Sequence, residues 1–157
     1  MRELYQAVDN IFMGDSDLKG LVNYTQKKLN IRRGFQPPDE NWNKSVIYYT
    51  QGGIPKTDFN PQFRDIPLIV RVYDRKDDLS CSDIAERIIL LLEGADLTTT
   101  DKLKVFDCSY TGDLVPLSWN QTVKSWEQVL RFMIVVRVDK VTGSSGYPTR
   151  KLGRIWK

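Results

Sequence analysis

The segment from residue 127 to residue 139, EQVLRFMIVVRVD, constrains the fold more than any other part of the chain. From Leu130 to Val138 every second residue is apolar, and the residues between them mix apolar side chains with two arginines. A period of two is typical of a long β-strand with one face on a core and the other face partly in water. We therefore expect a sheet in which this strand is a principal member.

Other segments show strand or helix patterns. Three of them alternate, or are rich in β-branched and aromatic residues, and are predicted to be strands: 45–51, 65–75 and 103–109. Apolar residues recur at helical spacing in residues 2–12 and 82–93, which predicts two amphipathic helices. A further helical turn or two is predicted within residues 18–29.

The remaining segments carry glycine and proline or lack a regular period, and are predicted to be irregular: 30–44, 52–63 and 110–126. Ser80 or Ser82 can cap the helix over residues 82–93, and Gly94 stands where a helix-ending glycine belongs. The element order predicts an α+β domain over residues 1–139. We expect a mainly antiparallel four-stranded sheet with two helices packed on one face, plus projecting loops and a C-terminal arm.

The 157 residues include no histidine, and this absence limits the chemistry. Serine–histidine and cysteine–histidine nucleophiles are excluded. The two cysteines, Cys81 and Cys108, cannot hold zinc without further ligands, and they suggest a reducing cytoplasm rather than a disulfide framework. The first ten residues lack the apolar core of a signal peptide, and the sequence has no apolar run of about 18 residues, so we expect neither a signal peptide nor a membrane span.

An acidic stretch follows the strand at 65–75 and raises the question of a metal site. It contains Asp74, Asp77 and Asp78, but a calcium loop would need a central glycine, and Arg75 and Lys76 lie inside this one. A magnesium-dependent enzyme built on the three carboxylates is the alternative. We expect instead that they face solvent, a lumen or an adjacent subunit, and we expect no metal, no cofactor and no catalytic residue.

The C-terminal arm, residues 140–157, differs in charge from the rest of the chain. It carries five lysines and arginines and no acid, so the net charge of +3 leaves −2 for the remainder. Its apolar residues include Leu152, Ile155 and Trp156, which are costly to expose and indicate docking onto a partner. A solubilising tail is the alternative. A further functional alternative concerns a different segment: the mixture of arginine and aromatic residues around residues 31–49 could bind single-stranded nucleic acid.

In its layout the sequence resembles the tail terminator (tail completion, head–tail joining) proteins of long-tailed bacteriophages. The resemblance spans the opening helix to about Asp139 and rests on five pieces in order: that helix, SVIYYTQGGIP, IPLIVRVYDRKDDLSCSDIAERIILLLEG, LKVFDCSYTGDLVP and VLRFMIVVRV. Tyr73 and Asp74 after a strand, followed by Ala85 and the leucines at 90–92, carry it most clearly.

The resemblance implies a structural virion protein, not an enzyme. It implies a homo-oligomeric, hexameric ring that ends the tail tube and joins the head connector, assembled in the host cytoplasm. DNA would pass through the lumen without sequence-specific binding. Another neck, connector or tail-tube subunit is the alternative. Candidate interface residues are aromatic, apolar or basic: Ile54, Phe59, Phe63, Trp119, Trp126, Arg150, Lys151, Arg154 and Trp156.

Overall fold

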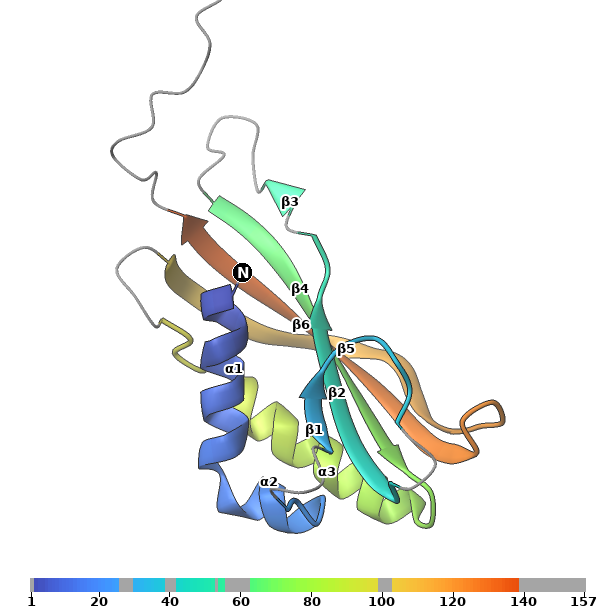
Figure 1. Ribbon diagram of the computed structural model, residues 1–157. Coiled ribbons are helices and arrows are strands. Elements are labelled where there is room, and N and C mark those ends of the chain that lie inside the picture. The colour runs from blue at the N-terminus through green and yellow to red at the C-terminus, as the bar shows by residue number, and fades with distance from the viewer. Residues whose placement is uncertain are drawn as a thin grey trace, which may run out of the picture.

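The computed structural model describes residues 2–25, 30–38, 42–52, 54–55, 63–98 and 103–138. Its helices are α1 (Arg2–Gly14), α2 (Ser16–Leu21) and α3 (Asp78–Leu92). Its strands are β1 (Ile31–Arg33), β2 (Lys44–Thr50), β3 (Ile54–Pro55), β4 (Phe63–Asp74), β5 (Leu103–Asn120) and β6 (Ser125–Val138). Figure 1 shows α1 and α3 on one side of a strongly twisted sheet. The C-terminal arm lies outside the described residues.

The sheet runs in the order β1-β2-β4-β6-β5, and the short β3 pairs with the beginning of β4. All these pairs are antiparallel except β1 with β2, which is parallel. The expected four-stranded, mainly antiparallel sheet with two helices is therefore wrong, because the described residues form a mixed sheet of six strands and three helices. The α+β class itself is compatible with this architecture.

Two segments that we expected to be irregular account for the difference. Residues 31–33 form β1 beside β2, so part of the expected loop at 30–44 belongs to the sheet. Residues 110–126 do not form a loop either, because β5 continues to Asn120 and turns directly into β6. The third helix, α2, overlaps the start of residues 18–29, where the sequence predicts a further helical turn or two, and its N-cap residue Asp15 accepts a hydrogen bond from the backbone N–H of Leu18.

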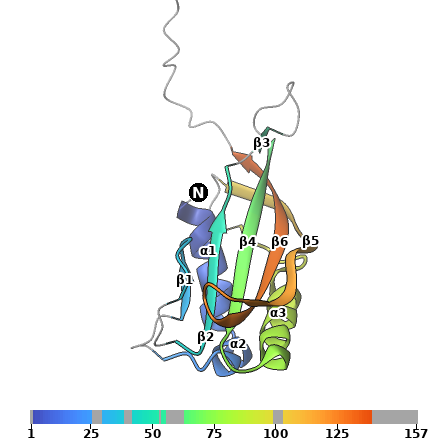
Figure 2. The same cartoon turned by 90° about the vertical axis from the view of Figure 1, so that its right-hand side faces the viewer.

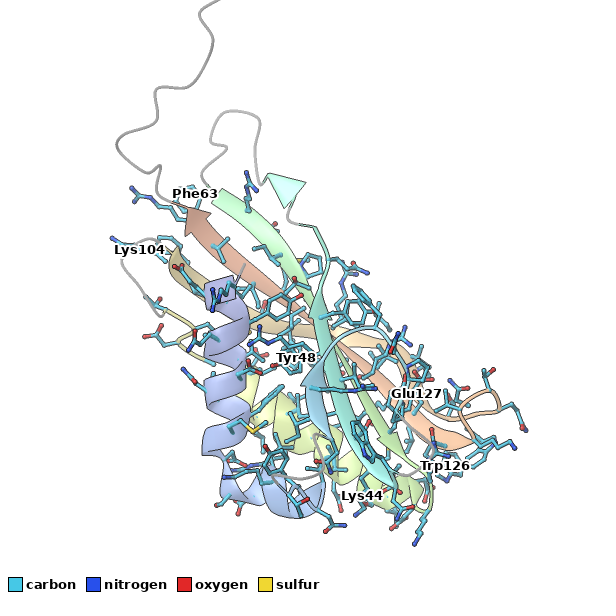
Figure 3. All side chains as sticks on the ribbon, viewed as in Figure 1. Lys44, Tyr48, Phe63, Lys104, Trp126 and Glu127 are labelled. Carbon is cyan, nitrogen blue, oxygen red and sulfur yellow. The ribbon has the colours of Figure 1, made fainter. Side chains whose placement is uncertain are left out.

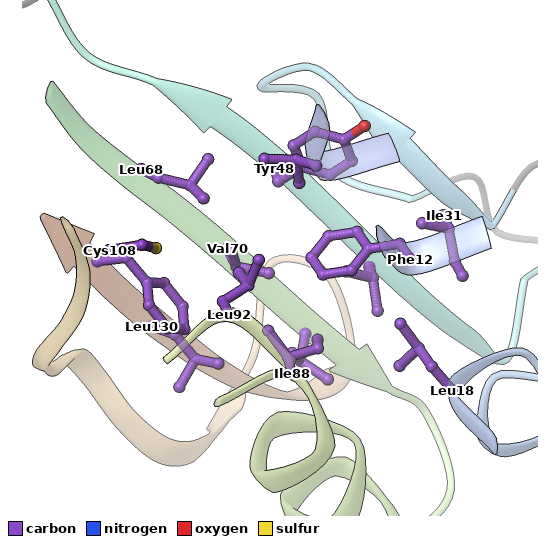
Figure 4. Packing of buried hydrophobic residues seen from close by; sticks show 14 of the residues in the cluster. Phe12, Leu18, Ile31, Tyr48, Leu68, Val70, Ile88, Leu92, Cys108 and Leu130 are labelled. Atoms are coloured by element: carbon purple, nitrogen blue, oxygen red, sulfur yellow. The ribbon is translucent and has the colours of Figure 1, made fainter. Parts of the chain in front are cut away.

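The core lies between the helices and one face of the sheet (Figure 4). On β6 the apolar face predicted from the sequence is buried at Leu130, Phe132, Ile134 and Val136. The rings of Phe12 on α1 and Tyr48 on β2 meet edge to face, with centroids 5.4 Å apart. The two longer helices each bury one stripe against the sheet: Leu4, Ala7, Val8 and Phe12 on α1, and Cys81, Ile84, Ala85, Ile88 and Leu92 on α3.

The ends of α3 are set by local hydrogen bonds. Asp77 is the N-cap, and its side chain accepts from the backbone N–H of Leu79, so the expected cap at Ser80 or Ser82 is wrong. Both serines lie inside the helix, which begins earlier than its apolar period indicates. Gly94 follows the last turn with a φ of +67°, a conformation that glycine adopts without strain, and this agrees with the prediction for its position.

Both cysteine thiols should be unreactive in the folded protein. Cys81 and Cys108 are fully buried, and burial raises the pKa of each thiol to about 12. A thiol-reactive disulfide reagent at pH 8 should label neither residue in buffer and both in concentrated guanidinium chloride, because the thiolate is the reacting form. Labelling of the folded protein at the rate of a free thiol would contradict this burial.

Candidate subunit interface

The β5–β6 hairpin is the longest feature of the sheet, and its turn is encoded locally. Asn120 ends β5, and its side-chain oxygen accepts from the backbone N–H groups of Thr122 and Val123 at 3.0 and 3.1 Å. Such a side-chain-to-backbone bond mimics a backbone turn. Lys124 completes the reversal with a φ of 53°, and Ser125 begins β6.

Register shifts bend this hairpin. The pairing of β5 with β6 is interrupted between Val105 and Asp107, between Tyr110 and Gly112, and twice more before Ser118. Extra residues in one strand increase the local twist and bend it. Gly112 adopts a φ of +114°, which favours glycine over any residue with a Cβ. The hairpin therefore curves, and its tip projects on the side away from α1 (Figures 1 and 2).

Exposed apolar side chains gather on β5. Four of the seven large apolar side chains that are exposed in the described part of the chain lie there: Phe106 (57% exposed), Leu114 (47%), Val115 (37%) and Trp119 (41%). Hydrophobic side chains that collect on one exposed element mark a contact surface more often than scattered ones do. We call these four residues the β5 apolar row; they lie along one strand but not on one face, because the register pairs Val115 with Val129 and Trp119 with Trp126, on opposite faces of β6.

The two tryptophans of the hairpin form a cross-strand pair. Trp119 lies opposite Trp126 in the register, and their rings meet at 76° with centroids 5.6 Å apart. Trp126 is half-buried and packs against the main core, whereas Trp119 is exposed. The partly buried ring thus supports the exposed one, and a rigid, exposed aromatic side chain is a typical interface anchor.

A buried polar group ties the turn end of the hairpin to β4. Glu127 is almost fully buried beside Trp126 (Figure 3), and its carboxylate accepts from Asn120 Nδ2 at 2.6 Å. Arg71 Nη1 on β4 lies 3.6 Å from the same carboxylate and 3.5 Å from the hydroxyl of Tyr73. Burial raises the pKa of Tyr73, so its hydroxyl stays protonated. These bonds hold the hairpin in one orientation.

The three aspartates of the acidic stretch have structural roles. Asp74 is fully buried, so our expectation that it faces solvent is wrong. Its Oδ1 accepts from the backbone N–H groups of Lys76 and Asp77 at 2.9 and 3.1 Å, and Lys44 Nζ lies 3.9 Å from its Oδ2. Asp77 is exposed and caps α3, and Asp78 is half-buried in the first turn. Among the described residues no group of acids and cysteines is arranged to hold a metal.

Replacing Asp74 with alanine should lower the free energy of unfolding by about 1–3 kcal/mol. The substitution takes the charged acceptor away from the part-buried backbone N–H groups of Lys76 and Asp77, and hydrogen bonds to a charged group are worth an amount of that order. The control is Asp83→Ala on the exposed side of α3, which should change the free energy by less than about 0.5 kcal/mol. Urea unfolding followed by circular dichroism measures both, and equal losses would remove Asp74 from this structural role.

The other candidate interface residues are dispersed. Ile54 belongs to β3, which pairs with Asp65 and Arg64 of β4. Phe63 opens β4, and its ring lies 5.4 Å from that of Phe106, so it extends the β5 apolar row at the far end of the strand. The remaining candidates lie outside the described residues: Phe59, Arg150, Lys151, Arg154 and Trp156.

Sequence reasoning missed Phe106, Leu114 and Val115 as interface candidates. Phe106 lies in the predicted strand 103–109, whereas Leu114 and Val115 lie in a segment whose glycine, proline and register shifts hide the strand from the sequence pattern. In the described part of the chain no helix is long and apolar enough to cross a membrane.

The fold is similar to that of a solved virion chain. A chain from a structure described as the virion of a native gene transfer agent (GTA) particle matches with a TM-score of 0.66 over 83% of this chain and 91% of that one. The identity between them is 13%, so the likeness shows the fold alone. The sequence matches no protein family, and no curated protein is detectably similar to it.

Proposed function

We propose that this chain is a structural subunit of a phage-like virion. One observation carries the proposal: a fold similar to that of a gene transfer agent virion chain bears an apolar row on a braced, projecting hairpin. A subunit that joins others needs rigid exposed anchors, since preorganised side chains lose little entropy on binding. The β5 apolar row, with Trp119 supported by Trp126, meets that requirement.

Within this class we propose the tail terminator role, which the sequence layout favours. The chain would form a hexameric ring at the head-proximal end of the tail tube, end tube polymerisation and contact the head connector. A closed ring needs two different surfaces on each subunit. The β5 apolar row supplies one of them, and its counterpart lies on the neighbouring copy. DNA would pass through the ring without base-specific contacts.

Native mass spectrometry and negative-stain electron microscopy of the purified protein test the proposal. The expected result is a ring of one size, formed at micromolar concentration or on adding tail tubes. Tubes capped at one end would support the terminator role. A protein that stays monomeric at every concentration and never associates with tube ends would contradict it.

The free edge of β5 favours one other role in the same class. Among the described residues no strand but β6 pairs with β5. Residues 93–98 bond to its outer edge as far as Tyr110, which leaves the rest of that edge for a strand from a neighbouring copy. Repeated strand addition of this kind suits a tail-tube subunit. Filaments in the same micrographs would favour that role, and twelvefold rings would favour a connector.

A further inference from the structure

The outer side of α3 carries two exposed leucines with acids between them. Leu79, Asp83, Glu86 and Leu90 are spaced four, three and four residues apart, so they form one stripe along the helix. Leu79 is 70% exposed and Leu90 is 72% exposed. The opposite side of the helix is buried against the sheet at Cys81, Ile84, Ala85, Ile88 and Leu92. We call the exposed set the α3 stripe.

The surroundings of the α3 stripe are acidic. Arg75 and Lys76 precede the helix, and from Asp77 to Glu93 the chain has five acids and one base, Arg87. That base is already paired, because its guanidinium lies 2.5 Å from Asp15 and 3.3 Å from Asp17 of the neighbouring α2 segment. The Arg87 contact lowers the pKa of Asp15, so the pair stays ionised at neutral pH. A ligand of the α3 stripe therefore has to be cationic and partly apolar.

The last eight residues of this chain have that chemistry. Residues 150–157, RKLGRIWK, combine four cations with Leu152, Ile155 and Trp156. The arm from residue 140 onward spans up to about 60 Å when extended, which is enough to reach beyond its own subunit. The end of β6 that precedes the arm lies beside the start of β4, because Arg137 pairs with Phe63. The start of α3 follows the other end of β4, where Asp74 pairs with Trp126. The arm and the start of α3 therefore belong to opposite ends of the sheet.

We infer that residues 150–157 of one copy dock on the α3 stripe of a neighbouring copy. The inference rests on the proposed ring, in which each subunit must offer a donor surface and a different acceptor surface. Lysine and arginine of the arm face Asp83 and Glu86, and the apolar residues of the arm cover Leu79 and Leu90. The contact gives the ring a direction, because the arm and the helix are different parts of the subunit.

A charge swap between two variants tests the inference. The helix-reversed variant carries Asp83→Lys and Glu86→Lys, and the arm-reversed variant carries Arg150→Glu, Lys151→Glu and Arg154→Glu. Each variant alone should associate at least tenfold more weakly than the parent, because like charges then face each other across the contact. An equimolar mixture should recover the assembly with alternating subunits, since both pairings become complementary. Native mass spectrometry resolves the two masses.

Three further measurements keep the outcome unambiguous. Both variants should unfold at the temperature of the parent, because the changed helix residues are exposed. Asp96→Lys, a charge reversal outside the stripe, should leave assembly unchanged. Leu79→Ser with Leu90→Ser should weaken assembly without any change of charge.

The failure of the inference differs from the failure of the proposed function. If the parent assembles but the mixture does not recover, the docking of the arm on a neighbour is wrong and the ring stands. If either variant alone assembles as well as the parent, the docking of the arm on a neighbour is also wrong, and the proposed ring stands. A parent that never assembles overturns both the inference and the proposed function.

Discussion

Replacing Phe132 with alanine should lower the free energy of unfolding by about 3–5 kcal/mol, the cost of emptying a fully buried aromatic site. Phe132 lies on β6, between the two strands that pair with it, opposite Leu68 on β4 and Tyr110 on β5. Its ring is 5.6 Å from that of Tyr110. A domain of this size is typically stable by only about 5–15 kcal/mol, so this one change should bring it close to unfolding.

Met133→Ala is the matched control, since it alters the next residue of the same strand on the opposite, half-buried face. The partial burial of Met133 predicts a loss of about 1 kcal/mol. Urea denaturation followed by tryptophan fluorescence measures both variants. Equal losses would mean that the core does not lie on the helix-covered face of β6.

The central strands could be predicted from the sequence because they lie between two neighbours and bury one face regularly. The period of two in β6 identified Leu130, Phe132, Ile134 and Val136 as core residues, and all four are buried. Similarly, the helical period of residues 82–93 predicts one face with Ile84, Ile88, Leu91 and Leu92, of which all but the half-buried Leu91 are fully buried. Both periods can be recognised in the sequence because the same face of each regular element packs against the core along its whole length.

The second half of β5 could not be predicted in this way. Its register shifts insert extra residues, so the side chains do not alternate strictly between the two faces. Gly112 and Pro116 are also the residue types that mark turns. In β1 the difficulty is length, because three residues show no period and only the neighbouring β2 makes them a strand.

The residues of the candidate subunit interface could also be predicted only in part from the sequence. Residue type alone makes Trp119 a candidate, and it is exposed, whereas Leu114 and Val115 lie where the sequence predicts no strand. Asp74 was misassigned because an aspartate that accepts two backbone N–H bonds from the following turn has the same sequence context as a solvated one. Burial of a polar residue depends on tertiary contacts that a single sequence does not record.

Replacing Leu114 and Trp119 together with lysine should weaken self-association at least about 100-fold. Both side chains are exposed in the single subunit, so the substitutions remove interface contacts without emptying the core. Two anchor residues worth about 2 kcal/mol each account for an effect of this size, since every 1.4 kcal/mol is a factor of about ten. Analytical ultracentrifugation of the parent and the variant over a concentration series measures it.

Phe35→Lys is the control, because Phe35 is at least as exposed but lies just beyond β1, at the other edge of the sheet, with its ring on Tyr49. Assembly should be unchanged in that variant if the β5 apolar row is the interface. Leu114→Lys alone should give part of the loss and leave the contact between the two tryptophans intact. If Phe35→Lys disrupted assembly and the double variant did not, the interface would lie at the β1 edge, and the projecting hairpin would need another partner.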